Sequence, residues 1–138
     1  MAQTKINIHD QQYEFWSKLQ KAKPTVYRLT PQRSQFCYIS KKLTTKPYQL
    51  RLDIYLDPSY HQSNGCQSFT ICNVPKGGLS DDQIAQIEKE FGTKGTYYNE
   101  NGRYPNCHVI KNNSDDSLSE KEMMKWFNNH IETLINII

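Results

Sequence analysis

Long apolar runs are missing from this sequence of 138 residues. Its apolar runs extend over only a few residues, far short of the roughly 20 needed to span a bilayer, and residues 1–5 lack the apolar stretch of a signal peptide. We therefore expect a cytoplasmic protein without membrane contacts. The length is that of one ordinary domain, so we expect residues 1–138 to form a single domain around one core.

Closely spaced cysteine pairs are also missing. None of the four cysteines is part of a Cys-x-x-Cys pair; they are Cys37, Cys66, Cys72 and Cys107. A structural zinc site takes four ligands that are usually paired in sequence, whereas the nearest set here, His61 with Cys66 and Cys72, is loosely spaced and has no fourth partner. We expect reduced cysteines in or beside the core, and neither a metal nor a cofactor.

The sequence shows no familiar catalytic constellation. No predicted strand leads through a glycine-rich phosphate turn into a helix, and none carries the Glu-x-Lys of restriction-type nucleases. Asp53 and Asp57 share a strand face but lie about 13 Å apart along it. No local motif places a serine or cysteine beside a histidine. We assign no catalytic residue and place an enzymatic function behind two binding functions.

Acidic residues are absent between Ser17 and Leu52, a stretch with nine basic ones. These are Lys18, Lys21, Lys23, Arg28, Arg33, Lys41, Lys42, Lys46 and Arg51. From Leu79 onward ten acidic residues stand against six basic ones. Basic side chains interleaved with tyrosines are typical of surfaces that hold phosphates and stack on bases. A solvated face, or one that docks on the acidic half of a second copy, has the same composition.

Hydrophobic periodicity and turn signals predict three helices and about five strands. The helices begin after Asp10, Ser80 and Ser119, and the last two have capping boxes. Strands are expected at 36–39, 48–57, 69–72, 96–98 and 107–110, the last two as a hairpin across Asn101-Gly102. This order favours an α+β fold, a single antiparallel sheet with three helices packed mainly on one face.

The predicted strand 48–57 has two different faces. Leucine and isoleucine side chains fall on one face. Arg51, Asp53, Tyr55 and Asp57 fall on the other face, which we expect to be solvent-exposed or functional. In the strand 107–110, His108 is expected to point to solvent or to this polar face. The candidate ligand-binding residues, for phosphate contact and base stacking, are Arg28, Arg33, Tyr38, Lys41, Lys42, Arg51 and Tyr55.

Four segments occur in the order and approximate spacing of a known family: residues 15–19, 50–56, 86–92 and 124–127. Over about residues 13–138 the chain resembles the bacterial domain-of-unknown-function family 4268, often found at the C-terminal end of restriction-endonuclease-like proteins. The sequence departs from the family pattern by an insertion at 60–78. Because that family has no established activity, the resemblance implies only an accessory domain in a defence or nucleic-acid setting.

Two binding functions follow. The first is a non-catalytic protein of a prokaryotic or phage system for antiviral defence or counter-defence, which binds a nucleic acid or nucleotide on a basic, tyrosine-bearing surface. The alternative is a protein–protein inhibitor or adaptor of a restriction or defence enzyme, with a homodimer as one form of such an interface. Material that co-purifies with the protein separates the two: a nucleotide supports the first, a stoichiometric protein the second.

Overall fold

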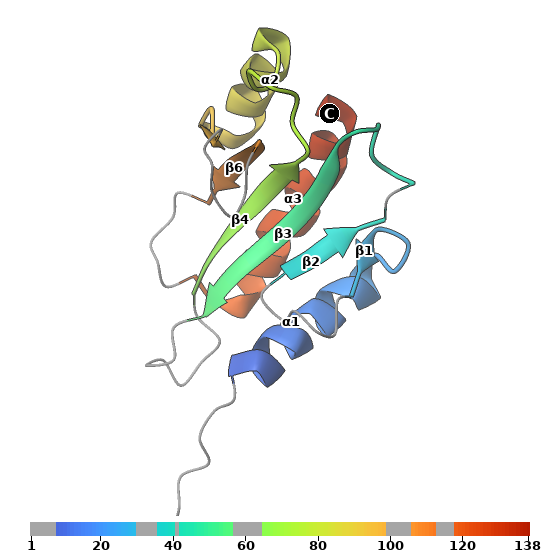
Figure 1. The fold of residues 1–138 in the computed structure, drawn as a ribbon. Coiled ribbons are helices and arrows are strands. Elements are labelled where there is room, and N and C mark those ends of the chain that lie inside the picture. The colour runs from blue at the N-terminus through green and yellow to red at the C-terminus, as the bar shows by residue number, and fades with distance from the viewer. Residues whose placement is uncertain (1–7, 30–35, 41, 57–64, 99–105, 113–117) are drawn as a thin grey trace, which may run out of the picture.

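The structure is a computed structural model that describes residues 8–29, 36–40, 42–56, 65–98, 106–112 and 118–138. Three helices and six strands follow one another in the order α1, β1, β2, β3, β4, α2, β5, β6, α3 (Figure 1). None of the helices in these ranges is long and apolar enough to cross a membrane.

Local signals explain where the helices begin and end. Helix α1 (Ile8–Ala22) already contains Asp10, so the start predicted after Asp10 is wrong. It ends shortly before Pro24, which cannot continue a helix. Helices α2 (Asp81–Phe91) and α3 (Glu120–Ile137) both begin with the predicted capping boxes, formed by Ser80 with Gln83 and by Ser119 with Glu122. Gly92 closes α2 in the left-handed conformation, with φ 72°.

All six strands form one antiparallel sheet in the order β1-β2-β3-β4-β6-β5. The strands are β1 (Tyr27–Arg28), β2 (Phe36–Ile39), β3 (Gln49–Leu56), β4 (Gly65–Cys72), β5 (Thr96–Tyr98) and β6 (Cys107–Lys111). The predicted α+β class with a single antiparallel sheet is confirmed. The predicted hairpin pairs as β5 with β6, while its Asn101-Gly102 turn lies outside the described residues.

The sheet is larger than the sequence suggested at two places. The two-residue strand β1 pairs with β2 in a segment where we expected no strand. Strand β4 begins at Gly65 rather than at Phe69, because residues 65–68 pair with residues 53–56 of β3. Gly, Gln and Ser have little preference for strands, so only the neighbouring strand places them in one.

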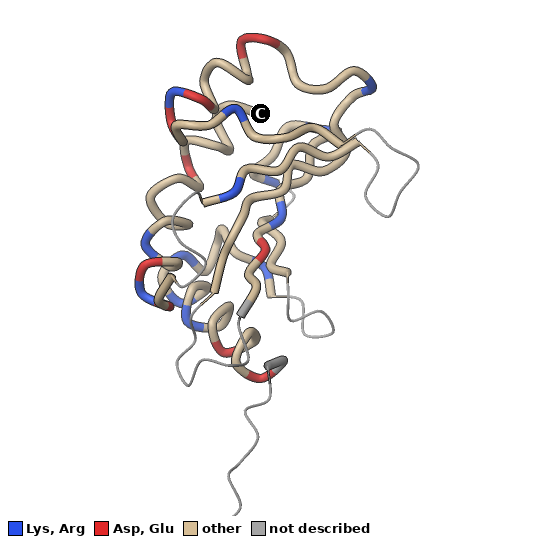
Figure 2. Tube along the Cα trace, turned by 90° about the vertical axis from the view of Figure 1, so that its left-hand side faces the viewer, with Lys and Arg blue, Asp and Glu red and all other residues tan. Residues whose placement is uncertain are grey.

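The three helices cover one face of the sheet, which we call the covered face (Figure 2). The ring of Phe69 on β4 lies 5.2 Å from that of Phe127 on α3 and 5.8 Å from that of Phe91 on α2. On α1 the ring of Trp16 lies 5.8 Å from Phe127. The core therefore lies between this face and the helices, and no described helix lies over the opposite face, the uncovered face.

His108 lies on the covered face and is 3% exposed. Our expectation that it points to solvent or to the polar face is therefore wrong. Its Nε2 atom lies 2.7 Å from the Lys94 carbonyl oxygen, in the connection between α2 and β5, so a backbone group satisfies this ring nitrogen in the interior. Burial lowers the pKa of His108, and the neutral ring is favoured.

Candidate functional site

The strand register brings candidate residues into one row across the uncovered face. Arg28 on β1 lies opposite Tyr38 on β2, and Tyr38 lies opposite Arg51 on β3. The row continues through Thr70 on β4. Three residues that are far apart in sequence thus become neighbours, because side chains that face each other across adjacent strands point to the same side of a sheet.

Arg51 is the centre of a compact polar network in this row. Its Nε atom lies 2.9 Å from Oδ1 of Asp53, and its guanidinium carbon lies 4.2 Å from the centroid of the Phe36 ring. The hydroxyl of Thr70 donates a hydrogen bond of 2.6 Å to the second carboxylate oxygen of Asp53. Ion pairing, a cation–π contact and a cross-strand hydrogen bond therefore fix the two charges against the sheet.

Burial and pairing have opposite effects on the pKa values of this pair. Burial raises the pKa of Asp53, against the opposing effects of Arg51 and of hydrogen bonds from Thr70 and Ser68. Burial is also the largest single effect on the pKa of Arg51 and acts to lower it, but Asp53, Cys72 and Tyr38 together outweigh it and leave that pKa raised. With Arg51 only 9% exposed, this pair braces the sheet, and direct contact of Arg51 with a ligand stays a prediction.

Other cations and aromatic rings on the uncovered face are open to solvent. Arg28 on β1 and Lys111 on β6 are exposed. Tyr55 is 68% exposed and Tyr98 44% exposed, although large aromatic side chains are usually covered. The face therefore presents positive charge and stacking surfaces together.

Acidic residues are concentrated in the helical layer, which also carries basic residues. Every acidic residue in the described ranges except Asp53 lies in one of the three helices, on the far side of the sheet (Figure 2). Within those ranges the uncovered face carries Arg28, Arg51 and Lys111 against Asp53 alone. The two halves of different charge in the sequence do not become the two sides of the fold: Lys18 and Lys21 of the basic half lie on α1, and Lys111 of the acidic half lies on the uncovered face.

The remaining candidates lie in different places. Lys42 is exposed in the connection between β2 and β3. Tyr55 is on β3, four residues beyond Arg51 and about 13 Å along the strand. Arg33 and Lys41 lie outside the described residues.

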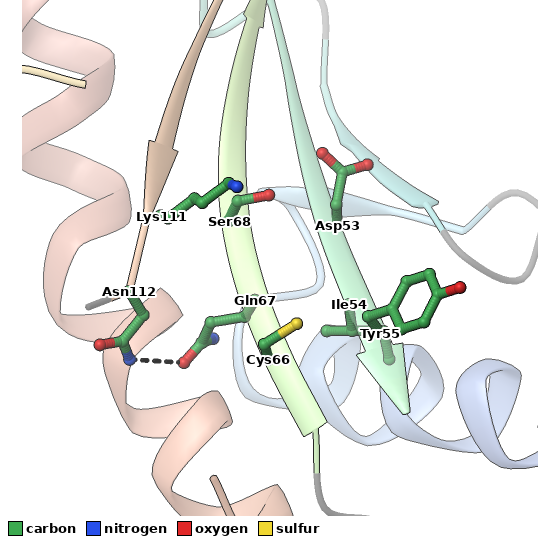
Figure 3. A pocket seen from close by; sticks show the side chains of 8 residues that line it. All are labelled: Asp53, Ile54, Tyr55, Cys66, Gln67, Ser68, Lys111 and Asn112. Carbon is green, nitrogen blue, oxygen red and sulfur yellow. Dashed lines mark hydrogen bonds between the residues drawn. The ribbon is translucent and has the colours of Figure 1, made fainter. Parts of the chain in front are cut away.

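A pocket of about 310 Å³ opens on the uncovered face between β3, β4 and β6 (Figure 3). The residues that line it are Asp53, Ile54, Tyr55, Cys66, Gln67, Ser68, Lys111 and Asn112. Of these eight lining residues, only Tyr55 is one of the ligand-binding residues predicted from the sequence. Lys111 follows Val109 by two positions and so shares its face, but its place beside Ser68 depends on pairing between β4 and β6, which no local signal shows.

Burial makes two of the thiols weak nucleophiles. It raises the pKa of Cys37 to about 12 and that of Cys72 to about 11, so both are protonated at neutral pH. Within the described ranges, no group of three or more His, Cys, Asp or Glu side chains is placed to hold a metal ion. The uncovered face presents cations, hydroxyl groups, thiols and aromatic rings, and its cations and rings suit binding.

Comparison with known proteins adds no family or function. The sequence matches no protein-family model, no curated protein and no solved structure. The resemblance to family 4268 therefore stays a prediction, and the functional argument depends on the geometry of the uncovered face.

Proposed function

We propose that this protein binds a phosphate-bearing ligand, a nucleic acid or a nucleotide, on the uncovered face of its sheet. The observation that carries this proposal is the scarcity of acidic residues among the described residues of the uncovered face. Arg28 and Lys111 are exposed on a face where the described residues include one carboxylate, Asp53, and Arg51 already neutralises it. The other described acidic residues lie in the helices, where their repulsion of a polyanion is weakened by distance and salt.

The exposed tyrosines support a ligand that also has bases. Tyr55 and Tyr98 leave much of their rings in water, and each ring offers a flat surface on which a base of any sequence stacks. A phosphorylated protein partner would contact the cations through its phosphates but would have no base to stack on these rings. Cations and rings on one face therefore favour nucleic acids and nucleotides, in the defence setting that the sequence resemblance implies.

The first test identifies what the protein carries from the cell. We would purify it at low salt without nuclease, denature it and analyse the released material by mass spectrometry. The proposal predicts a nucleotide or oligonucleotide in near-stoichiometric amount. An empty preparation that instead retains a second protein in fixed ratio supports the inhibitor or adaptor function.

The second test measures how binding of a labelled oligonucleotide depends on salt. Arg28→Gln and Lys111→Gln each remove one phosphate contact, so each should weaken binding and reduce the slope of log affinity against log salt by about one. Lys125→Gln is the matched control, because Lys125 is exposed on α3 beyond the covered face. Equal affinities and slopes for all three variants and the unaltered protein would contradict the proposal.

A further inference from the structure

The pocket on the uncovered face has a rigid floor and two different sides. Its floor is formed by β4, which pairs with β3 along eight residue pairs and with β6 on its other edge. Gln67, 4% exposed, donates a hydrogen bond of 2.8 Å to the Met123 carbonyl on α3 and accepts one of 2.9 Å from Asn112 (Figure 3). These bonds hold the floor to the helical layer, so the pocket is formed before any ligand arrives.

The two sides of the pocket offer stacking and charge. Tyr55 stands on β3 with most of its ring exposed, and Lys111 stands on β6 beyond Ser68 (Figure 3). Strands β3 and β6 are two inter-strand spacings apart, about 10 Å. Lys111 is the cation among the residues that line the pocket, so phosphate is directed to Lys111 and a base to the exposed ring of Tyr55.

The stacking surface of the pocket decides which form of nucleic acid can use it. The ring of Tyr55 is largely exposed and takes a base only through an open ring face. The bases of a duplex stack on one another and leave no ring face for Tyr55. Only an unpaired base reaches the pocket.

We infer that the pocket between Tyr55 and Lys111 is a base-binding subsite that selects single-stranded over double-stranded nucleic acid. This inference rests on the proposed function. One unpaired base stacks on Tyr55, while the phosphate attached to it contacts Lys111. Sequence preference is expected to be weak, because stacking tolerates every base.

The test compares a labelled DNA strand of about 12 nucleotides, the RNA of the same sequence and the matching duplex by fluorescence anisotropy. We expect the single strands to bind at least about 10-fold more tightly than the duplex. Tyr55→Leu should weaken single-strand binding about 10-fold or more, whereas Tyr55→Phe keeps the ring and should retain it. Tyr13→Leu is the matched control, because Tyr13 is an exposed tyrosine on α1.

The outcomes separate this inference from the function it rests on. Equal affinity for strand and duplex, or unchanged binding by Tyr55→Leu while Lys111→Gln still weakens it, overturns the base subsite and leaves phosphate binding intact. Absence of binding to strand and duplex alike, together with a preparation that releases no nucleotide, overturns both. Urea unfolding of each variant shows whether a loss of binding comes from a loss of fold, and for the exposed Tyr55 we expect none.

Discussion

The two faces of the sheet achieve order by different means. On the covered face, the ring of Phe127 contacts those of Phe69 and Trp16 and all three exclude water, so shape and apolar area decide stability. On the uncovered face, Arg51 and Asp53 are ordered by charge and hydrogen bonds while Tyr55 remains in water. Apolar and polar side chains alternate along β3 and so supply both faces. One strand can therefore contribute to stability through one side and to binding through the other.

The largest expected effect is on the covered face. Phe127→Ala removes a fully buried ring that contacts α1 and β4, so it should lower the free energy of unfolding by about 3–5 kcal/mol. Urea unfolding followed by circular dichroism measures this loss. Tyr55→Leu on the uncovered face should change it by no more than about 0.5 kcal/mol. Similar losses in the free energy of unfolding for Phe127→Ala and Tyr55→Leu would contradict the conclusion that the buried rings of the covered face contribute far more to stability than the exposed ring of Tyr55.

A smaller effect is expected where a glycine lies against His108. Gly95 has φ 74°, and a Cβ atom there would lie 2.6 Å from the ring Nε2 of His108. Gly95→Ala should cost about 2–3 kcal/mol, from left-handed strain and loss of the bond to Lys94. Gly92→Ala is the control, because its φ of 72° is similar but a Cβ atom there would have no atom of a distant residue within 4 Å. Only the backbone strain, a cost of about 1–2 kcal/mol in stability, remains. Equal losses would show that the interior around His108 is loosely packed.

The third prediction tests the ion pair of the uncovered face. Arg51→Met leaves the Asp53 carboxylate half-buried without its cation and should cost about 1–3 kcal/mol at pH 7. The pKa of Asp53 is already raised in the folded protein and should rise further in the variant. A folded state that takes up a proton more readily than the unfolded state gains stability as the pH falls. The variant should gain more than the unaltered protein, so the stability lost through Arg51→Met should shrink toward pH 4.

Urea unfolding of both proteins between pH 7 and pH 4 gives this comparison. Arg28→Met is the control on the same face, because exposed Arg28 should change stability by no more than about 0.5 kcal/mol at any of these pH values. A loss for Arg51→Met that does not depend on pH would show that the pair contributes through packing alone.

Much of the fold was predictable from local signals. The capping boxes at Ser80 and Ser119 fixed the starts of two helices, and the alternation along 48–57 separated a core side from a polar side. These signals act between residues that are near in sequence, so no knowledge of the rest of the fold is needed. The additional strand β1 has only two residues and escaped notice, because so short a segment has no periodicity.

The candidate site was less predictable, because it depends on pairing between distant strands. Tyr38 and Arg51 were named from composition, but their adjacency follows from the register of β2 and β3. Lys111 was missed, since it reaches the pocket only through the pairing of β6 with β4 across α2 and β5. The burial of His108 was also missed, because its partner is a backbone carbonyl, which a sequence does not distinguish from any other.

The strands at the two borders of the sheet are short, with two residues in β1 and three in β5. A border strand presents unpaired backbone groups on which another chain can add a strand, and the length of the border limits how many such bonds form. These two strands offer few of them. Addition of a strand at β1 or β5 is therefore disfavoured, while the broad face of the sheet remains open to solvent.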